Sequence, residues 1–327
     1  MKYNGLKLKS SNKQAATIMG ILILLLLITF PLAPLSIASA EEIKSRAAVV
    51  MDAETGRVLY AKNPDLRLMP ASTTKLMTAL VVIERTNLGD VVTVSKKASL
   101  APATKIGLRQ GDNITIEALL NTTLIKSAND AAVALAEATA GSEEEFVSLM
   151  NEKALALGLN NTRFINPNGL PGTGQYITAH DLAEIMRQAI RYPLLKEILG
   201  TRMAEIYTGE GKTILIRNTN KLLWSDEALL EGKTGYTREA RHCFVGAKAC
   251  ETGTIIVALL GTPSRTLLWK ETEDLMALGT RVMNNLEEPV VYISKVDYGT
   301  AKVKKASYKV KKASYKKSKK KKKRHRI

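Results

Sequence analysis

Cysteine, histidine and aromatic residues are scarce in this chain of 327 residues. It contains two cysteines, three histidines and 5% aromatic residues. Two cysteines are too few for a disulfide scaffold, and they do not have the paired spacing of a zinc module. Three histidines do not supply a histidine-rich metal site. We therefore expect no metal and no cofactor, and a fold that depends on a hydrophobic core, for which 45% hydrophobic residues are available.

Acidic residues are absent from both ends of the chain, whose formal net charge is +17. Residues 302–327 hold 15 Lys and Arg, and residues 1–40 hold four Lys. The central residues 41–301 therefore carry a net charge of only −2. A nearly neutral globular domain is not expected to bind nucleic acid, so any binding to a polyanion has to come from the tail.

Residues 1–40 have the order of a secretory signal peptide. Lysines precede an apolar run over residues 15–30, and Ala38-Ser39-Ala40 supplies the small residues of a cleavage site. We predict cleavage after Ala40. A retained membrane anchor is the alternative, because the apolar run with its flanks nearly reaches the length that spans a bilayer. Both interpretations predict that the folded domain is exported.

Residues 291–327 form a basic, lysine-rich tail. Residues 302–308 and 309–315 are identical in sequence. Because the lysines repel one another and apolar residues are few, we predict that the tail is disordered. No aliphatic stripe accompanies the charge, which argues against an amphipathic anchor helix. For an exported protein the tail is predicted to bind wall polymers or anionic lipid headgroups, with a tail that only raises solubility as the alternative.

Residues 41–290 have the pattern of an α+β domain. Two β-type runs, 47–52 and 58–61, flank a turn with Gly56 and predict a hairpin. Later β-type runs and a last helix follow a long helical stretch, which predicts an antiparallel sheet built from both ends of the chain and packed against helices. The expected helices are 70–84, 116–140, 142–158, 178–192 and 264–286, and the later strands are 213–217, 242–248 and 254–260.

Ser72-Thr-Thr-Lys75 stands at the start of a predicted helix. The i, i+3 spacing places the hydroxyl and the amine on one helical face, within reach of each other. A helix N-terminus also offers free N–H groups and a positive dipole end to a developing oxyanion. The pattern recurs at Ser10, Ser314 and Ser318, but only Ser72 lies in a folded, apolar segment. A helix-capping serine is the alternative.

Two further motifs favour a catalytic role for Ser72 over a helix-capping role. Ser127-Ala128-Asn129 lies within the predicted helical block, where polar side chains need partners. Lys233-Thr234-Gly235 follows a loop and is predicted to precede a strand. Its glycine allows another backbone to approach, while lysine and threonine offer a cation and a hydroxyl. The three motifs, separated by 55 and 106 residues, form a strong composite signal.

With these motifs the sequence resembles the penicillin-recognising serine enzymes, and among them the low-molecular-weight D-alanyl-D-alanine carboxypeptidases. The resemblance covers residues 43–290 and implies a β-lactamase/DD-peptidase-like fold with a mostly helical second lobe. It implies an exported enzyme that removes the terminal D-Ala from peptidoglycan stem peptides ending in D-Ala-D-Ala through an acyl-enzyme, and that is acylated by β-lactams. The further segments that carry it are 70–71, 166–170, 176–182, 218–223 and 232–237.

The resemblance also implies roles for single residues. Ser72 would be the acylated nucleophile, Lys75 the base, and Ser127 a relay of protons to the leaving D-alanine. Lys75 must then be uncharged, which requires burial or a neighbouring cation such as Lys233.

The implied substrate contacts come from the second and third motifs. Asn129 would hold the substrate amide, and the backbone N–H groups of Ser72 and Tyr236 would form the oxyanion hole. Thr234 and Thr237, beside Lys233 and Gly235, would receive the terminal carboxylate. A basic residue that assists them is not singled out by the sequence, and the candidates are Arg217, Lys221 and Arg238.

Other residues depart from the family pattern or from expectation. Asn168 stands where the family often has histidine, so its side chain is not expected to act as an essential acid or base. Cys243 and Cys250 are about 23 Å apart on an extended strand, too far for a disulfide, and we expect both to be unpaired. A Cys243 nucleophile is disfavoured because His242 would face the opposite side of the strand.

Three alternatives use related chemistry. A class A β-lactamase would need a deacylating glutamate after the second motif, typically in an E-x-x-L-N setting, and no such segment occurs. An endopeptidase or transpeptidase would use the same residues on another substrate, and the sequence does not separate these activities. A non-catalytic β-lactam sensor or wall-binding protein is the alternative from a different functional class.

Overall fold

The computed structural model describes residues 43–102, 104–209, 211–225 and 230–292. The predicted signal peptide and nearly all of the basic tail lie outside these described residues. Across the described ranges, no helix has both the length and the apolar character needed to cross a membrane.

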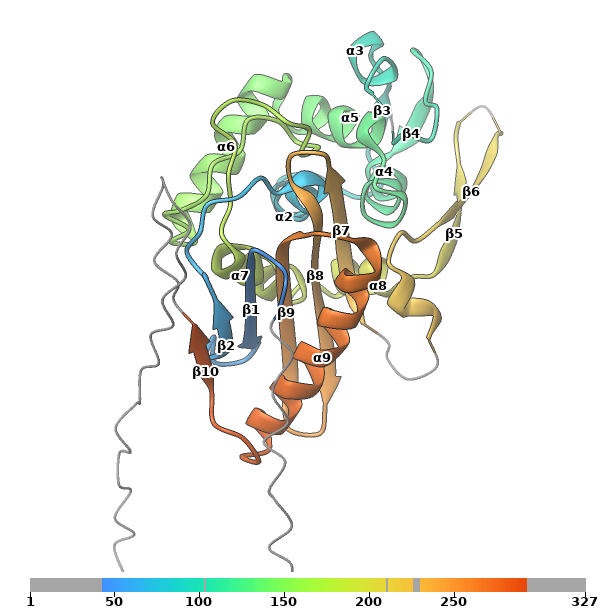
Figure 1. The fold of residues 1–327 in the computed structure, drawn as a ribbon. Coiled ribbons are helices and arrows are strands. Elements are labelled where there is room, and N and C mark those ends of the chain that lie inside the picture. The colour runs from blue at the N-terminus through green and yellow to red at the C-terminus, as the bar shows by residue number, and fades with distance from the viewer. Residues whose placement is uncertain (1–42, 103, 210, 226–229, 293–327) are drawn as a thin grey trace, which may run out of the picture. The chain divides into compact units, whose positions relative to one another are not determined.

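A six-stranded sheet, in the order β10-β2-β1-β9-β8-β7, forms the base of the domain. Neighbouring strands are antiparallel except for β10, which runs parallel to β2. The first and last parts of the described chain thus complete one sheet, and the predicted α+β architecture is confirmed (Figure 1). The strands are β1 (Ala47–Asp52), β2 (Val58–Lys62), β7 (Glu231–Thr237), β8 (Arg241–Cys250), β9 (Gly253–Thr262) and β10 (Val290–Tyr292).

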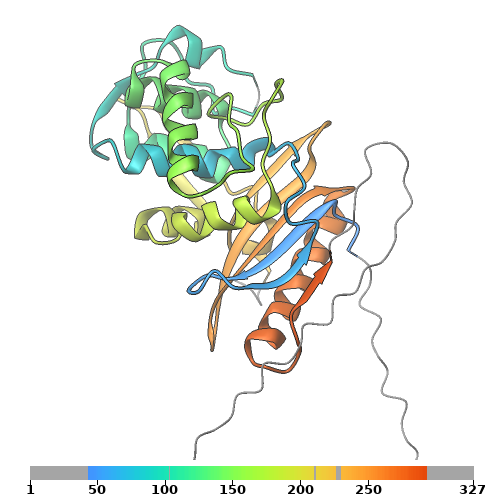
Figure 2. The ribbon, with the colours of Figure 1, turned by 90° about the vertical axis from the view of Figure 1, so that its left-hand side faces the viewer.

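Helices cover both faces of this sheet (Figure 2). α9 (Arg265–Met283) packs against β9, β8, β1 and β2, and α7 (Ala179–Ala189) packs against β9, β1 and β8. The central strand β1 is buried along its whole length, because side chains from α7 and α9 meet it from opposite sides.

The remaining helices form the mostly helical second lobe that the family resemblance implies. α2 (Lys75–Ile83) is buried over eight of its nine residues and contacts α5, α6 and α7. α2 thus links the lobe to the helix that covers the sheet. The other elements of the lobe are β3 (Val91–Thr93), α3 (Lys96–Ser99), β4 (Asn113–Thr115), α4 (Ile116–Asn121), α5 (Asn129–Ala140) and α6 (Glu143–Ala156).

A second, two-stranded sheet connects the lobe to the large sheet. β5 (Met203–Tyr207) pairs antiparallel with β6 (Thr213–Arg217). β6 contacts the end of the helical block and β5 contacts α4, so this hairpin packs on the lobe. α8 (Pro193–Gly200), which precedes the hairpin, contacts β7, the strand of the third motif. α8 is not among the helices expected from the sequence; Pro193, next to the end of the expected helix 178–192, occupies its first turn.

Three local predictions were wrong, and all three concern the motifs. The segment 70–84 begins with a 3₁₀ turn, η1 (Ala71–Thr74), before α2. The block 116–140 is interrupted by one π-helical turn, η2 (Thr122–Lys126), and by a left-handed residue, Ser127. The third motif lies inside β7 instead of before a strand.

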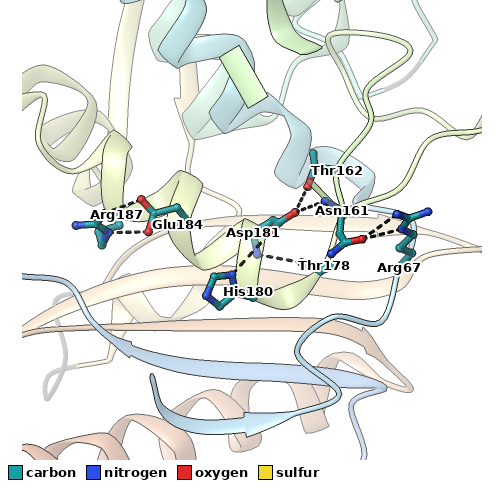
Figure 3. A network of polar contacts seen from close by, with 8 residues as sticks. All are labelled: Arg67, Asn161, Thr162, Thr178, His180, Asp181, Glu184 and Arg187. Carbon is teal, nitrogen blue, oxygen red and sulfur yellow. Dashed lines mark hydrogen bonds and ion pairs between the residues drawn. The ribbon is translucent and has the colours of Figure 1, made fainter. Parts of the chain in front are cut away.

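A polar network holds the start of α7 and the chain that leads to η1 (Figure 3). The Asp181 carboxylate accepts hydrogen bonds from Asn161 N and Thr162 Oγ1, and Arg67 donates to Asn161 Oδ1. His180 Nδ1 lies 3.6 Å from Asp181 Oδ1, and this hydrogen-bonding carboxylate raises the pKa of His180. The backbone of Leu68 also pairs with Ile177, which ties the chain four residues before Ser72 to the segment that precedes α7.

Candidate active site

The first motif lies where a 3₁₀ turn becomes an α-helix. Residues three apart eclipse each other in a 3₁₀ turn, which brings Ser72 and Lys75 together. Lys75 Nζ lies 3.0 Å from Ser72 Oγ. Ala71, directly before Ser72, has φ of +48°, in the left-handed region that non-glycine residues rarely adopt. The expected pairing of hydroxyl and amine is present, with backbone strain next to the serine.

Lys75 is completely buried and has two further oxygen partners. Its Nζ donates to Asn129 Oδ1 at 2.7 Å and to the main-chain oxygen of Asn168 at 2.6 Å. Burial lowers the pKa of Lys75 well below its ordinary value, and the positive charge of Lys233 lowers it further, against an opposing contribution from Asp130. The environment therefore favours the neutral amine.

The second motif is joined to the third by a direct hydrogen bond. Lys233 Nζ donates to Ser127 Oγ at 2.8 Å and to the main-chain oxygen of Thr234 at 3.0 Å. Lys233 is completely buried, and burial lowers its pKa to about 7. Ser127 has φ of +65°, and this left-handed residue after η2 presents its hydroxyl to Lys233. The structure thus brings together Ser72, Lys75, Ser127, Asn129 and Lys233.

Asn129 begins α5 and is fixed at both its backbone and its side chain. Its N–H donates to Thr104 O at 2.7 Å, and its Nδ2 donates to Pro102 O at 3.0 Å. With its nitrogen used in this way, the amide oxygen Oδ1 is the atom that faces Lys75. The side chain's orientation is therefore determined by the loop that precedes Ile106.

Asp130, which the sequence analysis did not select, holds that same loop. Its buried carboxylate accepts hydrogen bonds from the backbone N–H groups of Ile106, Gly107 and Leu108, at 2.9 to 3.3 Å. A carboxylate next to Asn129 in an alanine-rich buried segment is the signal that could have identified it, because such a charge needs strong partners.

The third motif brings β7 against the first. A Cβ on Gly235 would lie 3.0 Å from Ser72 N and 3.0 Å from Ala71 Cβ, closer than nearly all real contacts. Glycine therefore lets β7 approach the serine without a shift of Ala71 or Ser72. Lys233 and Gly235 share one face of the strand because side chains alternate. Tyr236 is exposed with its ring against His242, and Thr237 Oγ1 accepts a hydrogen bond from Ala240 N, so neither side chain contacts Ser72 in the described interactions.

Thr234 has a partner that the sequence analysis missed. Its Oγ1 lies 2.7 Å from Thr219 Oγ1. The three basic residues considered for the carboxylate, Arg217, Lys221 and Arg238, are all exposed, and the Arg217 guanidinium lies 4.0 Å from the centroid of the Trp224 ring. Thr219 lies in the segment 218–223 that carried part of the family resemblance, but a threonine gave no signal of its own.

The loop of Asn168 supports Lys75 through its backbone. The Asn168 side chain accepts a hydrogen bond from Leu170 N, whereas its main-chain oxygen is the partner of Lys75. Pro167 O accepts from Thr78 Oγ1 at 2.6 Å, and Gly169 lies against Ala71 with φ of +82°. The departure from histidine at position 168 leaves the contact to Lys75 unchanged, because that contact is made by the main chain.

Both cysteines are free, as predicted. Cys243 is completely buried, and burial raises the pKa of its thiol to about 12. It is therefore not a reactive thiolate near neutral pH.

Comparison with known proteins gives one consistent family. A family model described as D-alanyl-D-alanine carboxypeptidase, the S11 peptidases, matches residues 35–264. D-alanyl-D-alanine carboxypeptidase DacF of Bacillus subtilis is 39% identical over 209 residues, which cover 62% of this chain and 54% of that protein. The chain thus spans just over half the length of this relative.

Relatives with other named activities are similar to a comparable degree. A D-alanyl-D-alanine endopeptidase of Pseudomonas aeruginosa is 37% identical over 212 residues, 63% of this chain and 67% of that protein. The crystal structure of the Streptomyces K15 DD-transpeptidase matches with a TM-score of 0.69 and 31% identity, over 73% of this chain and 97% of that one. The family match covers well over half of the residues, and the chain belongs to the D-alanyl-D-alanine carboxypeptidase family, with the fold of the DD-peptidases.

Proposed function

We propose that the protein is a serine D-alanyl-D-alanine carboxypeptidase that removes the terminal D-Ala from peptidoglycan stem peptides through an acyl-enzyme on Ser72. The observation that carries the proposal is the contact, at 3.0 Å, between the Nζ of the completely buried Lys75 and the Oγ of the partly exposed Ser72. A hydroxyl becomes a nucleophile when a neighbouring base accepts its proton, and a buried lysine next to another cation can be that base.

The partners of Lys75 support this direction of proton transfer. A neutral amine has two N–H groups and one lone pair. The two N–H groups are used by Asn129 Oδ1 and Asn168 O, which accept and cannot donate at these atoms. The lone pair is left for the proton of Ser72. Ser72 Oγ then bonds to the carbonyl carbon of the penultimate D-Ala, and its proton passes to Lys75 Nζ.

Breakdown of the tetrahedral intermediate requires a proton for the leaving amine. Lys233 donates to Ser127 Oγ, so the Ser127 hydroxyl keeps its own proton to give away. As the bond between carbon and nitrogen breaks, D-alanine leaves with that proton, and Ser127 regains one from the protonated base. Water then hydrolyses the ester on Ser72 and restores the enzyme.

Binding of the substrate involves β7 and the second motif. Within the described chain β7 pairs only with β8, so no strand occupies its other edge, where an extended peptide would add beside Ser72. Asn129 would contact the substrate amide, the N–H groups of Ser72 and Tyr236 the oxyanion, and Thr234 and Thr237 the carboxylate. β-Lactams would acylate Ser72 by opening of their ring. An exported protein would meet both the wall peptide and these inhibitors.

Replacement of Ser72 tests the proposal directly. The purified protein should release D-alanine from a small acyl-D-Ala-D-Ala peptide, and Ser72→Ala should lower the rate by at least about 1,000-fold because the acyl-enzyme cannot form. Ser148→Ala, at an exposed serine of α6, is the matched control and should retain full activity. Release that persists in Ser72→Ala would contradict the assigned nucleophile.

Endopeptidase activity is the second candidate, since a relative of that name is as similar as the carboxypeptidases. A cross-linked peptide dimer offered beside the acyl-D-Ala-D-Ala peptide separates the two activities. Preferential release of monomers from the dimer would favour the endopeptidase.

A further inference from the structure

Thr219 lies between the two halves of the site and contacts both. Its hydroxyl is 2.7 Å from the hydroxyl of Thr234, and its backbone N–H donates to Ile125 O at 3.2 Å. Ile125 belongs to η2, two residues before Ser127. Thr219 therefore links the segment that carries the second motif to the threonine of the third.

The backbone around Thr219 is held on both sides. Asn218 Nδ2 donates to Thr201 O at 2.8 Å, and Asn220 Nδ2 donates to Leu230 O at 2.7 Å. Both asparagines are buried, whereas Thr219 itself is exposed. The two buried anchors fix the backbone of Thr219, so only its side-chain rotation has to be restrained for its hydroxyl to meet Thr234.

When an anion binds to Thr234, the hydrogen bond between the two hydroxyls can run in only one direction. Each threonine hydroxyl has one proton. If Thr234 gave its proton to Thr219, it would have none for a carboxylate. Thr234 can donate to the anion only if Thr219 is the donor of the 2.7 Å bond. A chain of two hydrogen bonds then runs from Thr219 through Thr234 to the ligand, and each bond strengthens the other.

We propose that Thr219 is a positioning residue for ligand recognition: its hydroxyl donates to Thr234 and directs the Thr234 proton toward the carboxylate of the substrate or of a β-lactam. This inference rests on the proposed function, in which Thr234 receives that carboxylate. Thr219 lies outside all three motifs, 14 residues before Lys233, and affects binding of the ligand carboxylate, not the proton transfers at Ser72.

Thr219→Val removes the hydroxyl and keeps the shape of the side chain. We expect KM for acyl-D-Ala-D-Ala to rise about fivefold with kcat within about twofold of wild type, because a hydrogen bond to a charged ligand is weakened before chemistry begins. The C-terminal amide of the same peptide should show a smaller rise. Thr219→Ser should restore KM, and Thr213→Val, at an exposed threonine of β6, should leave it unchanged.

A double-mutant cycle with Thr234→Val tests the coupling itself. If Thr219 acts through Thr234, its replacement should have no further effect on KM when Thr234 is already valine. Additive effects would overturn the inference, as would an unchanged KM in Thr219→Val, a KM that Thr219→Ser fails to restore, or a loss confined to kcat.

Acylation by benzylpenicillin provides a second readout that does not need peptide turnover. The penicillin carries a carboxylate, so Thr219→Val should lower the second-order rate of adduct formation about fivefold, and Thr219→Ser should not. If wild type forms the adduct but releases no D-alanine, the proposed carboxypeptidase activity fails while the role of Thr219 is still decided by this rate. If peptide release is normal and neither KM nor adduct formation responds to Thr219→Val, the inference fails alone.

Discussion

Lys75 and Lys233 are both buried, but they have different hydrogen-bond partners and different charged neighbours. Lys75 has two strong acceptors and the neighbouring Ser72 hydroxyl, and Lys233 lies close enough to lower its pKa. Lys233 donates to a serine hydroxyl and to a main-chain oxygen, and its pKa is about 7. The proposed base is thus a buried lysine whose pKa is lowered further by the positive charge of its neighbour Lys233.

This difference predicts how kcat/KM changes at alkaline pH. The ammonium form of Lys233 donates to Ser127, and it is lost as the pH rises through about 7. Lys75 must be neutral, and its lowered pKa keeps it neutral where an ordinary lysine would be charged. We expect kcat/KM to decrease as the pH is raised above about 7. A kcat/KM that keeps increasing up to pH 10 would show that catalysis does not depend on the charge of Lys233.

Gly169 is a residue at which a single methyl group should disturb the base. A Cβ there would lie 1.9 Å from Ala71 O, and φ is +82°. Gly169→Ala should move the Asn168 carbonyl away from Lys75 and lower kcat/KM by about 100-fold. Gly89→Ala, where a Cβ meets no atom within 4 Å, is the control and should retain activity. Activity within twofold of wild type in Gly169→Ala would contradict this role of the loop.

Among the elements, irregular turns place the functional side chains. The 3₁₀ turn η1 aligns Ser72 with Lys75, and the π-helical turn η2 ends at the left-handed Ser127. π-Turns and left-handed residues are costly, and they persist where surrounding contacts hold them. Here β7 contacts η1 and β6 contacts η2.

The loop that Asp130 holds should respond to a change of charge at that residue. Asp130→Asn replaces one acceptor oxygen by a donor that would face backbone N–H groups. We expect a loss of about 2 kcal/mol in the free energy of unfolding and a lower kcat/KM, because the loop also orients Asn129. Urea denaturation and peptide hydrolysis measure the two effects. Asp274→Asn, at an exposed carboxylate of α9, should change neither.

For the whole molecule, both ends of the described chain are tied to each other. The Glu271 carboxylate of α9 accepts hydrogen bonds from Lys44 N and Ser45 N, and Ser45 Oγ is 2.6 Å from Thr262 Oγ1. The chain therefore enters β1 at a point fixed by the last helix. β10, near the end of the described residues, completes the same sheet beside β2.

The charge of residues 302–327 predicts a role for the tail that is separate from catalysis. Removal of residues 302–327, which contain 15 Lys and Arg, should leave hydrolysis of a small peptide unchanged and should lower retention on isolated cell walls. Retention of the intact protein should fall as salt is raised, since exposed charges are screened. Wall retention that is equal with and without the tail, at low salt, would contradict the predicted binding of the tail to wall polymers.

The sequence by itself determined the α+β class, the positions of most strands and helices, and the three motifs, because these depend on local patterns and on residue types at fixed spacing. Only the tertiary structure decided which atoms meet. The main-chain oxygen of Asn168, the carboxylate of Asp130 and the hydroxyl of Thr219 act through contacts between segments far apart in the chain. A backbone oxygen has no sequence signature, and the break at Ser127 arises from packing that overrides the helical propensity of its alanine-rich surroundings.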